Sequence, residues 1–364
     1  MKHPLADVPP SGSRNFLYAG GKCYIINEEV RVCGLGTHRE SQQVCAAGRH
    51  RIGVEMETKA YRKDFSNLGF RMAISAVLIT AIQYAGQFIV LAVNSEWADN
   101  MNIMFAATMI PLFVLGYPVT FLIMGKGGDR RPVEKHKMTP GQFILAFMMS
   151  YGLLIAGNLI GLFITFGIGI LKGAEVVNPL MSIVNEGNIW ISAIYIVLLA
   201  PIFEEILFRK LICDRVAKYG QGTAVVVSGL MFGLFHGNFN QFFYAFFIGC
   251  FFAMIYLKTG EIKYTIGLHM IVNFIGNVLG GLLLQNVDIE SPTGMIIFGI
   301  YGLCVYGIAI AGIALFFINR QKMKLDAGEI TIEKGSRFKT VIGNWGMIVY
   351  SVLFLGMMIV MALM

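Results

Sequence analysis

The sequence predicts an all-α fold, a polytopic membrane bundle of about eight or nine transmembrane helices. Of 364 residues, 56% are hydrophobic and only 14% are charged, whereas soluble domains carry about 25% charged residues. Apolar runs long enough to cross a bilayer, which takes about 20 residues, recur along most of the chain. Lysine and arginine lie between these runs, as in the cytoplasmic loops of membrane proteins.

Each apolar run has almost no charge over its length, and this predicts one membrane helix per run. In chain order we expect helices at 72–94, 103–125, 142–171, 188–209, 223–240, 241–257, 265–285, 294–319 and 343–364. The fifth and sixth runs are short, and the polar stretch GNFNQ at 237–241 is their only divider. This ambiguity separates a count of eight from a count of nine.

The loops alternate in charge. Basic residues precede the first run and follow the second, fourth, sixth and eighth runs, with six Lys and Arg between 320 and 339. The intervening loops are acidic or nearly neutral, including the loop 172–187. The positive-inside rule therefore predicts a multi-pass protein of the cell membrane with a cytoplasmic N-terminus. The formal charge of +7 is spread over loops, so we expect no nucleic-acid partner.

We divide the chain into four parts: a polar extension at 1–55, helices at 56–187, a segment with the candidate site at 188–285, and helices at 286–364. The extension lacks an apolar core, so it is not a signal peptide. Met56 begins an ordinary basic lead-in to the first helix, and we expect it to be the natural start in place of Met1. The six cysteines indicate neither a disulfide framework nor a zinc module.

Four ionisable side chains lie inside the apolar body. Away from the ends of the runs, Glu204 and Glu205 are the only acids, and His236 and His269 are the only histidines. Each such group costs several kcal/mol on insertion scales, so it usually faces a cavity or a partner. Because all four fall within about 65 residues, we expect them to form one site.

Helix geometry gives a charged partner to only one of the two acids. Glu205 lies four residues before Arg209, the favourable order for an ion pair within a helix. Glu204 points about 100° away around the same helix and is predicted to be the functional carboxylate. Pro201 lacks a backbone donor and should loosen the helix beside the acids. Asn273 lies one turn after His269, on the same face.

Taken singly, these residues have bland explanations. A lone membrane histidine is usually a packing or hydrogen-bonding residue, Asn273 alone would join two helices, and a Glu–Arg pair alone would be structural. The combination of an acid, two histidines and an amide in one segment favours chemistry. A general base, together with N–H donors for a developing oxyanion, is what peptide hydrolysis requires.

Three motifs in this segment resemble those of a known family. They are Glu204-Glu205-x-x-x-Arg209, Phe232-x-x-x-His236 and His269-x-x-x-Asn273. In this order they resemble the CPBP family, which groups type II CAAX prenyl proteases with bacteriocin-processing and self-immunity (Abi) enzymes. The resemblance covers about residues 188–280 and departs from the family at no motif position.

The resemblance implies an intramembrane endopeptidase that uses a glutamate and no cofactor. Glu204 would deprotonate a water held between it and His236, and His269 and Asn273 would bind the oxyanion. Glu205 and Arg209 would support the helix. The substrate would be a peptide or membrane-protein tail cleaved near the cytoplasmic face, with the lipid bilayer as the other partner.

Three alternatives stay open at this stage. Two histidines and a carboxylate could hold zinc with a water, but no H-E-x-x-H occurs, so a site without metal is favoured. A non-catalytic immunity or scaffold protein could bind a peptide through the same residues. A transporter could use Glu204 as a proton carrier, although this class is built from internal repeats and none is evident here. Neither the substrate nor the oligomeric state is predicted.

Overall fold

The computed structural model describes the chain except for residues 1–22, 27–28, 33–37, 127–129, 132 and 177–187, and it describes side chains from Met56 onward. Predictions for the side chains of the 1–55 extension and for most of the loop 172–187 therefore lie outside the described residues. The chain divides into two compact units, Met1–Lys63 and Asp64–Met364.

The first unit contains two short strands, β1 (Cys23–Ile26) and β2 (Glu29–Val32), and the beginning of helix α1 (His38–Val93). The strands pair antiparallel, with Cys23 opposite Val32 and Ile26 opposite Glu29. The helix begins well before the apolar run that predicted it at 72–94. That Met56 is the natural start stays a prediction.

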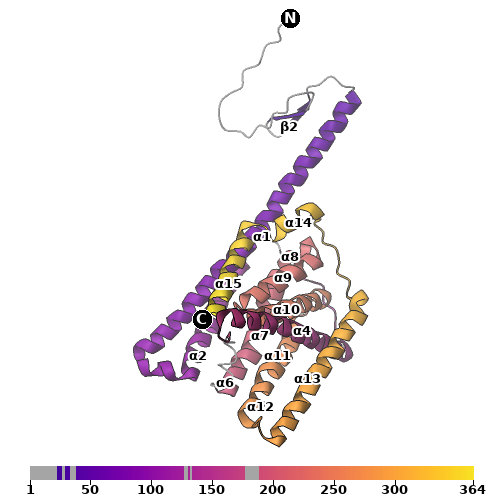
Figure 1. Ribbon diagram of the computed structural model, residues 1–364. Coiled ribbons are helices and arrows are strands. Elements are labelled where there is room, and N and C mark those ends of the chain that lie inside the picture. Colours follow the sequence, from indigo (N-terminus) through magenta and orange to yellow (C-terminus); the bar gives the residue numbers. More distant parts are fainter. Residues whose placement is uncertain (1–22, 27–28, 33–37, 127–129, 132, 177–187) are drawn as a thin grey trace. The chain divides into compact units, whose positions relative to one another are not determined.

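Every regular element described in the second unit is a helix (Figure 1). After α1 its elements are η1 (Ser95–Asp99), α2 (Met101–Pro111), η2 (Leu112–Gly116), α3 (Tyr117–Gly125), α4 (Pro140–Lys172), α6 (Ile189–Ala193), η3 (Ile194–Leu199), α7 (Ala200–Glu205), η4 (Ile206–Cys213), α8 (Asp214–Val216), η5 (Ala217–Tyr219), α9 (Gln221–Phe235), α10 (Phe239–Thr259), α11 (Ile262–Asn273), η6 (Phe274–Leu279), α12 (Gly280–Asn286), α13 (Pro292–Asn319), η7 (Arg320–Met323), α14 (Lys334–Val341) and α15 (Trp345–Leu363).

Among the described residues, eight continuous helical segments are long and apolar enough to cross a membrane. They are Met56–Val93, Met101–Gly125, Pro140–Lys172, Ile189–Tyr219, Phe239–Thr259, Ile262–Asn286, Pro292–Met323 and Trp345–Leu363. The prediction of a polytopic helical bundle with eight or nine membrane helices is confirmed.

The fifth predicted helix, at 223–240, is shorter than expected. Helix α9 ends at Phe235, and at 15 residues it is a short apolar helix below the length of a full span. Gly237 takes a left-handed φ of 65°, which breaks the helix, and the Asn238 side chain caps the next one by accepting from the Gln241 backbone N–H. The divider therefore lies at 236–238, and α10 begins at Phe239.

The basic loops lie together at one end of the second unit. The His136 N–H donates to the Thr259 carbonyl at 2.7 Å, which joins the 126–139 loop to the end of α10. The segment after η7 reaches the same end, because the Ile330 N–H donates to the Lys218 carbonyl at 3.0 Å and Lys258 pairs with Asp326. The alternation of charge along the chain thus corresponds to one basic face; that this face is cytoplasmic stays a prediction.

Glycines allow the central helices to pack closely. A Cβ at Gly157 of α4 would collide with the backbone of α10, one at Gly161 would be in tight contact with it, and a Cβ at Gly229 of α9 would collide with Cys250. These glycines belong to pairs spaced four apart, as is usual for close contacts between membrane helices. Helices α9 and α10 consequently lie in the middle of the second unit (Figure 1).

The segment Ile189–Tyr219 is helical throughout but not uniformly α-helical. Two π-helical stretches, η3 and η4, flank the short helix α7 that carries the two acids. Such stretches widen the helix through i→i+5 hydrogen bonds and are frequent at functional sites. Pro201 lies just after η3, so the predicted loosening of the helix takes this form.

Candidate active site

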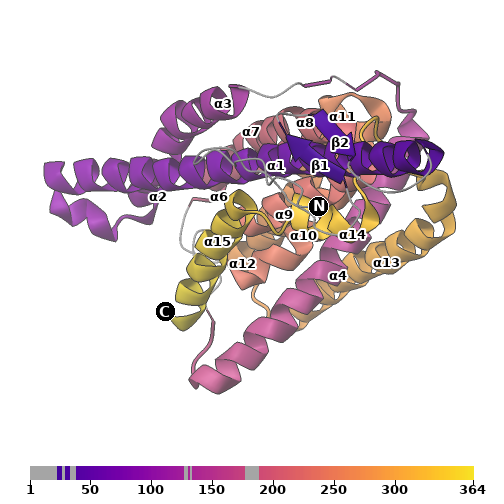
Figure 2. The same cartoon turned by 90° about the horizontal axis from the view of Figure 1, so that it is seen from above.

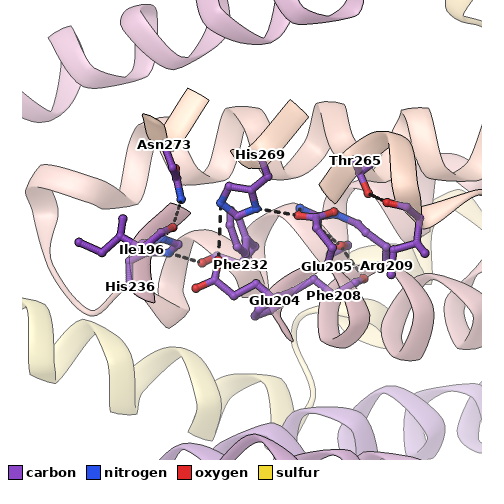
Figure 3. A network of polar contacts seen from close by, with 12 residues as sticks. Ile196, Glu204, Glu205, Phe208, Arg209, Phe232, His236, Thr265, His269 and Asn273 are labelled. Atoms are coloured by element: carbon purple, nitrogen blue, oxygen red, sulfur yellow. Dashed lines mark hydrogen bonds and ion pairs between the residues drawn. The ribbon is translucent and has the colours of Figure 1, made fainter. Parts of the chain in front are cut away.

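The residues predicted for the site come together from three parts of the bundle (Figure 3). Glu204 and Glu205 end α7, His236 follows the last residue of α9, and His269 and Asn273 lie on α11. The described contacts bring both acids to His269 and bring Asn273 to the backbone before α7. The sequence predicted that these residues share one site, and the structure groups them in this way. Their roles are proposed below.

Glu205 and Arg209 form a buried, two-pronged ion pair. Arg209 Nε donates to Glu205 Oε2 at 2.8 Å and Nη2 donates to Oε1 at 3.1 Å, and neither side chain has measurable exposure. The third arm of the guanidinium, Nη1, donates to Ser228 Oγ on α9 at 2.8 Å, and the group also lies 5.0 Å from the ring centre of Phe232. The pair therefore joins α7–η4 to α9.

His269 connects the two acids. Its Nδ1 lies 3.1 Å from Glu205 Oε1, and its Nε2 lies 3.7 Å from Glu204 Oε2. Glu205 is already paired with Arg209 and accepts at both oxygens, so the proton of this contact is on Nδ1 of the histidine. The nitrogen that faces Glu204 is therefore Nε2, and it carries a proton only in the imidazolium.

Glu204 is the more accessible acid, with its side chain 14% exposed against 0% for Glu205. Besides His269, it interacts with the hydroxyl of Tyr117, the first residue of α3. The Tyr117 ring is buried and lies 5.1 Å from the ring of Phe203, which places α3 beside α7 (Figure 2). Of the two carboxylates, Glu204 is the one with an exposed surface.

His236 presents one nitrogen outward. Its Nδ1 lies 2.9 Å from the Phe232 carbonyl, one turn earlier on the same helix. A carbonyl only accepts, so Nδ1 carries the proton and Nε2 is left as an acceptor in the neutral ring. The Phe232 ring packs edge-on against both imidazoles, at 4.9 Å from His236 and 5.8 Å from His269. Phe232 is thus a common wall for the two histidines.

Asn273 is held by a backbone carbonyl. Its Nδ2 donates to the carbonyl of Ile196 in η3 at 2.9 Å (Figure 3). One of its two N–H groups is thereby used, and a second is available on the same nitrogen. One turn later on the same helix, the Asn277 side-chain amide donates to the backbone carbonyl of Asn273 at 3.1 Å.

Within the part of the chain that is described, no group of three or more His, Cys, Asp or Glu side chains is arranged to hold a metal ion. The side chain of His236 is engaged with a backbone carbonyl, and that of His269 with a carboxylate. That the site works without a metal stays a prediction.

Sequence reasoning missed three participants. Ser228 and Tyr117 are ordinary polar residues of membrane helices, and neither spacing nor charge links them to the acids. The Ile196 carbonyl has no sequence signal of its own, although Pro201 five residues later gives an indirect one. Glu205 was assigned a supporting role, and its contact with His269 adds a link to the site.

This arrangement occurs in a segment that can be compared with known proteins. Residues 186–275 match the Rce1-like family. The family is described as type II CAAX prenyl endopeptidase, Rce1-like, so the predicted CPBP resemblance is confirmed over this segment. No curated protein and no solved structure matches the chain.

The Rce1-like segment contains the whole candidate site. It begins just before α6 and ends two residues after Asn273, so it includes all six residues of the candidate site. The match and the membrane helices together support a multi-pass membrane protein of an endopeptidase family. Processing of bacteriocins has no support in the match.

Proposed function

We propose that this protein is an intramembrane endopeptidase in which Glu204 activates the attacking water. The observation that supports it most directly is the unequal use of two adjacent acids within the Rce1-like segment. Glu205 is held in an ion pair with Arg209, whereas Glu204 is partly exposed and faces the Nε2 of His269. A carboxylate in this situation is suited to act as a general base.

The reaction begins with a water between Glu204 and the acceptor Nε2 of His236. Glu204 takes a proton from this water, and the oxygen attacks the carbonyl carbon of the scissile peptide. The carbonyl oxygen gains negative charge and is bound by N–H groups of His269 and Asn273. Glu204 then returns the proton to the leaving amine as the tetrahedral intermediate collapses.

The contacts of His269 fit the role of oxyanion donor. With Nδ1–H bound to the Glu205 carboxylate, Nε2 donates only when the ring is an imidazolium. The Glu205 carboxylate that accepts from Nδ1 fixes the orientation of the ring, with Nε2 towards Glu204. Glu205 therefore has two roles: it orients His269 for the reaction, and it stabilises the helix through its ion pair with Arg209.

The substrate we propose is a peptide or protein tail reached from the basic face of the bundle. CAAX-type substrates are the first to test, because the matching family is described as acting on them. The basic loops joined at this face would lie on the cytoplasmic side by the positive-inside rule. This orientation belongs to the proposal.

The experiment uses the full chain purified into vesicles, with a prenylated CAAX peptide and a panel of unprenylated peptides. Glu204→Gln should abolish cleavage of every peptide that the wild type cleaves, with unchanged folding. Glu290→Gln, in an exposed loop, is the matched control and should cleave normally. A folded Glu204→Gln protein that still cleaves would refute the proposal, and binding of a peptide without cleavage by the wild type would favour the scaffold alternative.

A further inference from the structure

Pro201 and Asn273 are joined through the Ile196 carbonyl. The backbone N–H of Ala200 donates to the Tyr195 carbonyl, five residues earlier, in the π-helical register of η3. In the same register the next donor would be residue 201, and its acceptor would be Ile196. Residue 201 is proline and has no N–H, so the Ile196 carbonyl has no helical donor there.

A carbonyl without a donor inside a membrane bundle is costly, because no lipid group replaces the missing hydrogen bond. The side chain of Asn273, from the opposing helix α11, donates to this carbonyl at 2.9 Å. The contact therefore depends on two features at once, the i→i+5 register of η3 and the proline that follows it. If η3 had an α-helical register, or if residue 201 had an N–H, a backbone donor would be available to the Ile196 carbonyl.

The orientation of the amide follows from the same contact. An asparagine amide has a donor end and an acceptor end of almost equal size, and a 180° turn about its last side-chain bond exchanges them. The Ile196 carbonyl accepts and cannot donate, so it fixes the Nδ2 end towards η3. A turned amide would present Oδ1, an acceptor, in the place of the donor.

We propose that Pro201 is a positioning residue: it reserves the Ile196 carbonyl for Asn273 and thereby fixes the donor end of the Asn273 amide in the site. The inference rests on the proposed function for its catalytic consequence, because only an oxyanion donor needs a fixed N–H. The structural part, in which Pro201 controls the orientation of Asn273, stands on the contacts alone. The π-helical stretch beside the acids thus leaves the Ile196 carbonyl available to orient Asn273.

The test uses four full-length proteins: wild type, Pro201→Ala, Asn273→Ala and the double variant. Removing an oxyanion donor typically lowers kcat about 10²- to 10³-fold, and this is the loss expected for Asn273→Ala. Pro201→Ala should lower kcat about 2- to 10-fold with KM unchanged, since one hydrogen bond supplies the bias between amide orientations. In the Asn273→Ala background, Pro201→Ala should have almost no further effect on kcat.

The control is Pro111→Ala. Pro111 also lies next to a π-helical stretch, immediately before η2, but it belongs to α2 and has no part in the site. It should leave kcat unchanged in both backgrounds. If Pro201→Ala lowers kcat equally with and without Asn273, the proline acts by shaping the helix and the proposal is overturned.

A second measurement needs no activity and separates this inference from the proposed function. In protein labelled with ¹⁵N-asparagine, the side-chain signal that Asn273→Ala removes belongs to Asn273. Its two protons should move and exchange faster in Pro201→Ala, and also in Pro201→Val, which is measured in parallel in case the alanine variant folds poorly. An unchanged signal would overturn the proposal. A shifted signal together with a fully active Glu204→Gln would uphold the positioning and refute the protease mechanism.

Discussion

Removing the charge of Arg209 tests how the site is held together. Arg209 makes two hydrogen bonds to Glu205 and one to Ser228, and both charged side chains are fully buried. Arg209→Met keeps the length of the side chain and leaves Glu205 without its cation. Breaking a buried pair in this way costs about 3–5 kcal/mol. His269 still contacts Glu205, so the lower end of this range is expected.

The free energy of unfolding can be measured in mixed micelles through the fluorescence of the three tryptophans, extrapolated to zero denaturant. The matched control is Lys210→Met, the next residue along the chain. Lys210 pairs with Asp214, four residues later, at 2.8 Å; its own side chain is 44% exposed, whereas that of Asp214 is 3% exposed and also accepts from the Tyr256 hydroxyl at 2.6 Å. Because the Lys210 ammonium is close to solvent and Asp214 keeps its hydrogen bond from Tyr256, this variant should be destabilised less than Arg209→Met.

A double variant separates the lost pair from lost packing. Arg209→Met combined with Glu205→Met removes both charges and should recover about 2 kcal/mol or more, because the uncompensated carboxylate is gone. Activity should not return with stability, since His269 has lost its carboxylate. The reasoning is refuted if Arg209→Met is as stable as Lys210→Met, or if the double variant is no more stable than the single one.

Three further predictions follow from the same contacts. Glu205→Gln should fold but cleave more slowly, because His269 loses the carboxylate that accepts from its Nδ1; cleavage lower than in Glu204→Gln at equal folding would reverse the roles given to the two acids. Gly157→Leu should be destabilised by at least about 1–3 kcal/mol from overpacking, whereas Gly167→Leu, with open space around it, should be neutral in the same unfolding assay. Cleavage should survive thorough chelation, and a loss that zinc alone restores would require a metal in the site.

The membrane fold was predictable because the bilayer imposes a strong constraint on composition. Runs of about 20 apolar residues have few alternatives to a spanning helix. The predicted starts at 142 and 294 lie two residues from the observed starts of α4 and α13, which are capped by Thr139 and Ser291. At α9 the predicted helix 223–240 ends early, at Phe235, because the left-handed Gly237 stops it at the start of the polar stretch 237–241.

The members of the site were predictable for a related reason. A charged or strongly polar residue in an apolar run is rare, so Glu204, Glu205, His236 and His269 stood out before any fold was known. Asn273 followed from its helical spacing to His269. Tyr117 and Ser228 did not, because a single hydroxyl in a membrane helix is common and its partner depends on how helices pack.

The two adjacent acids illustrate what packing adds to spacing. Helix geometry alone separated them by 100° and gave one of them to Arg209. The structure shows that they are joined again through His269, which contacts Glu205 at Nδ1 and Glu204 at Nε2. Arg209, Glu205, His269 and Glu204 therefore form one continuous chain of contacts from a fully buried cation to the accessible carboxylate. Because the buried end of this chain fixes the proton on His269 Nδ1, the ion pair that stabilises the helix also sets which nitrogen faces Glu204.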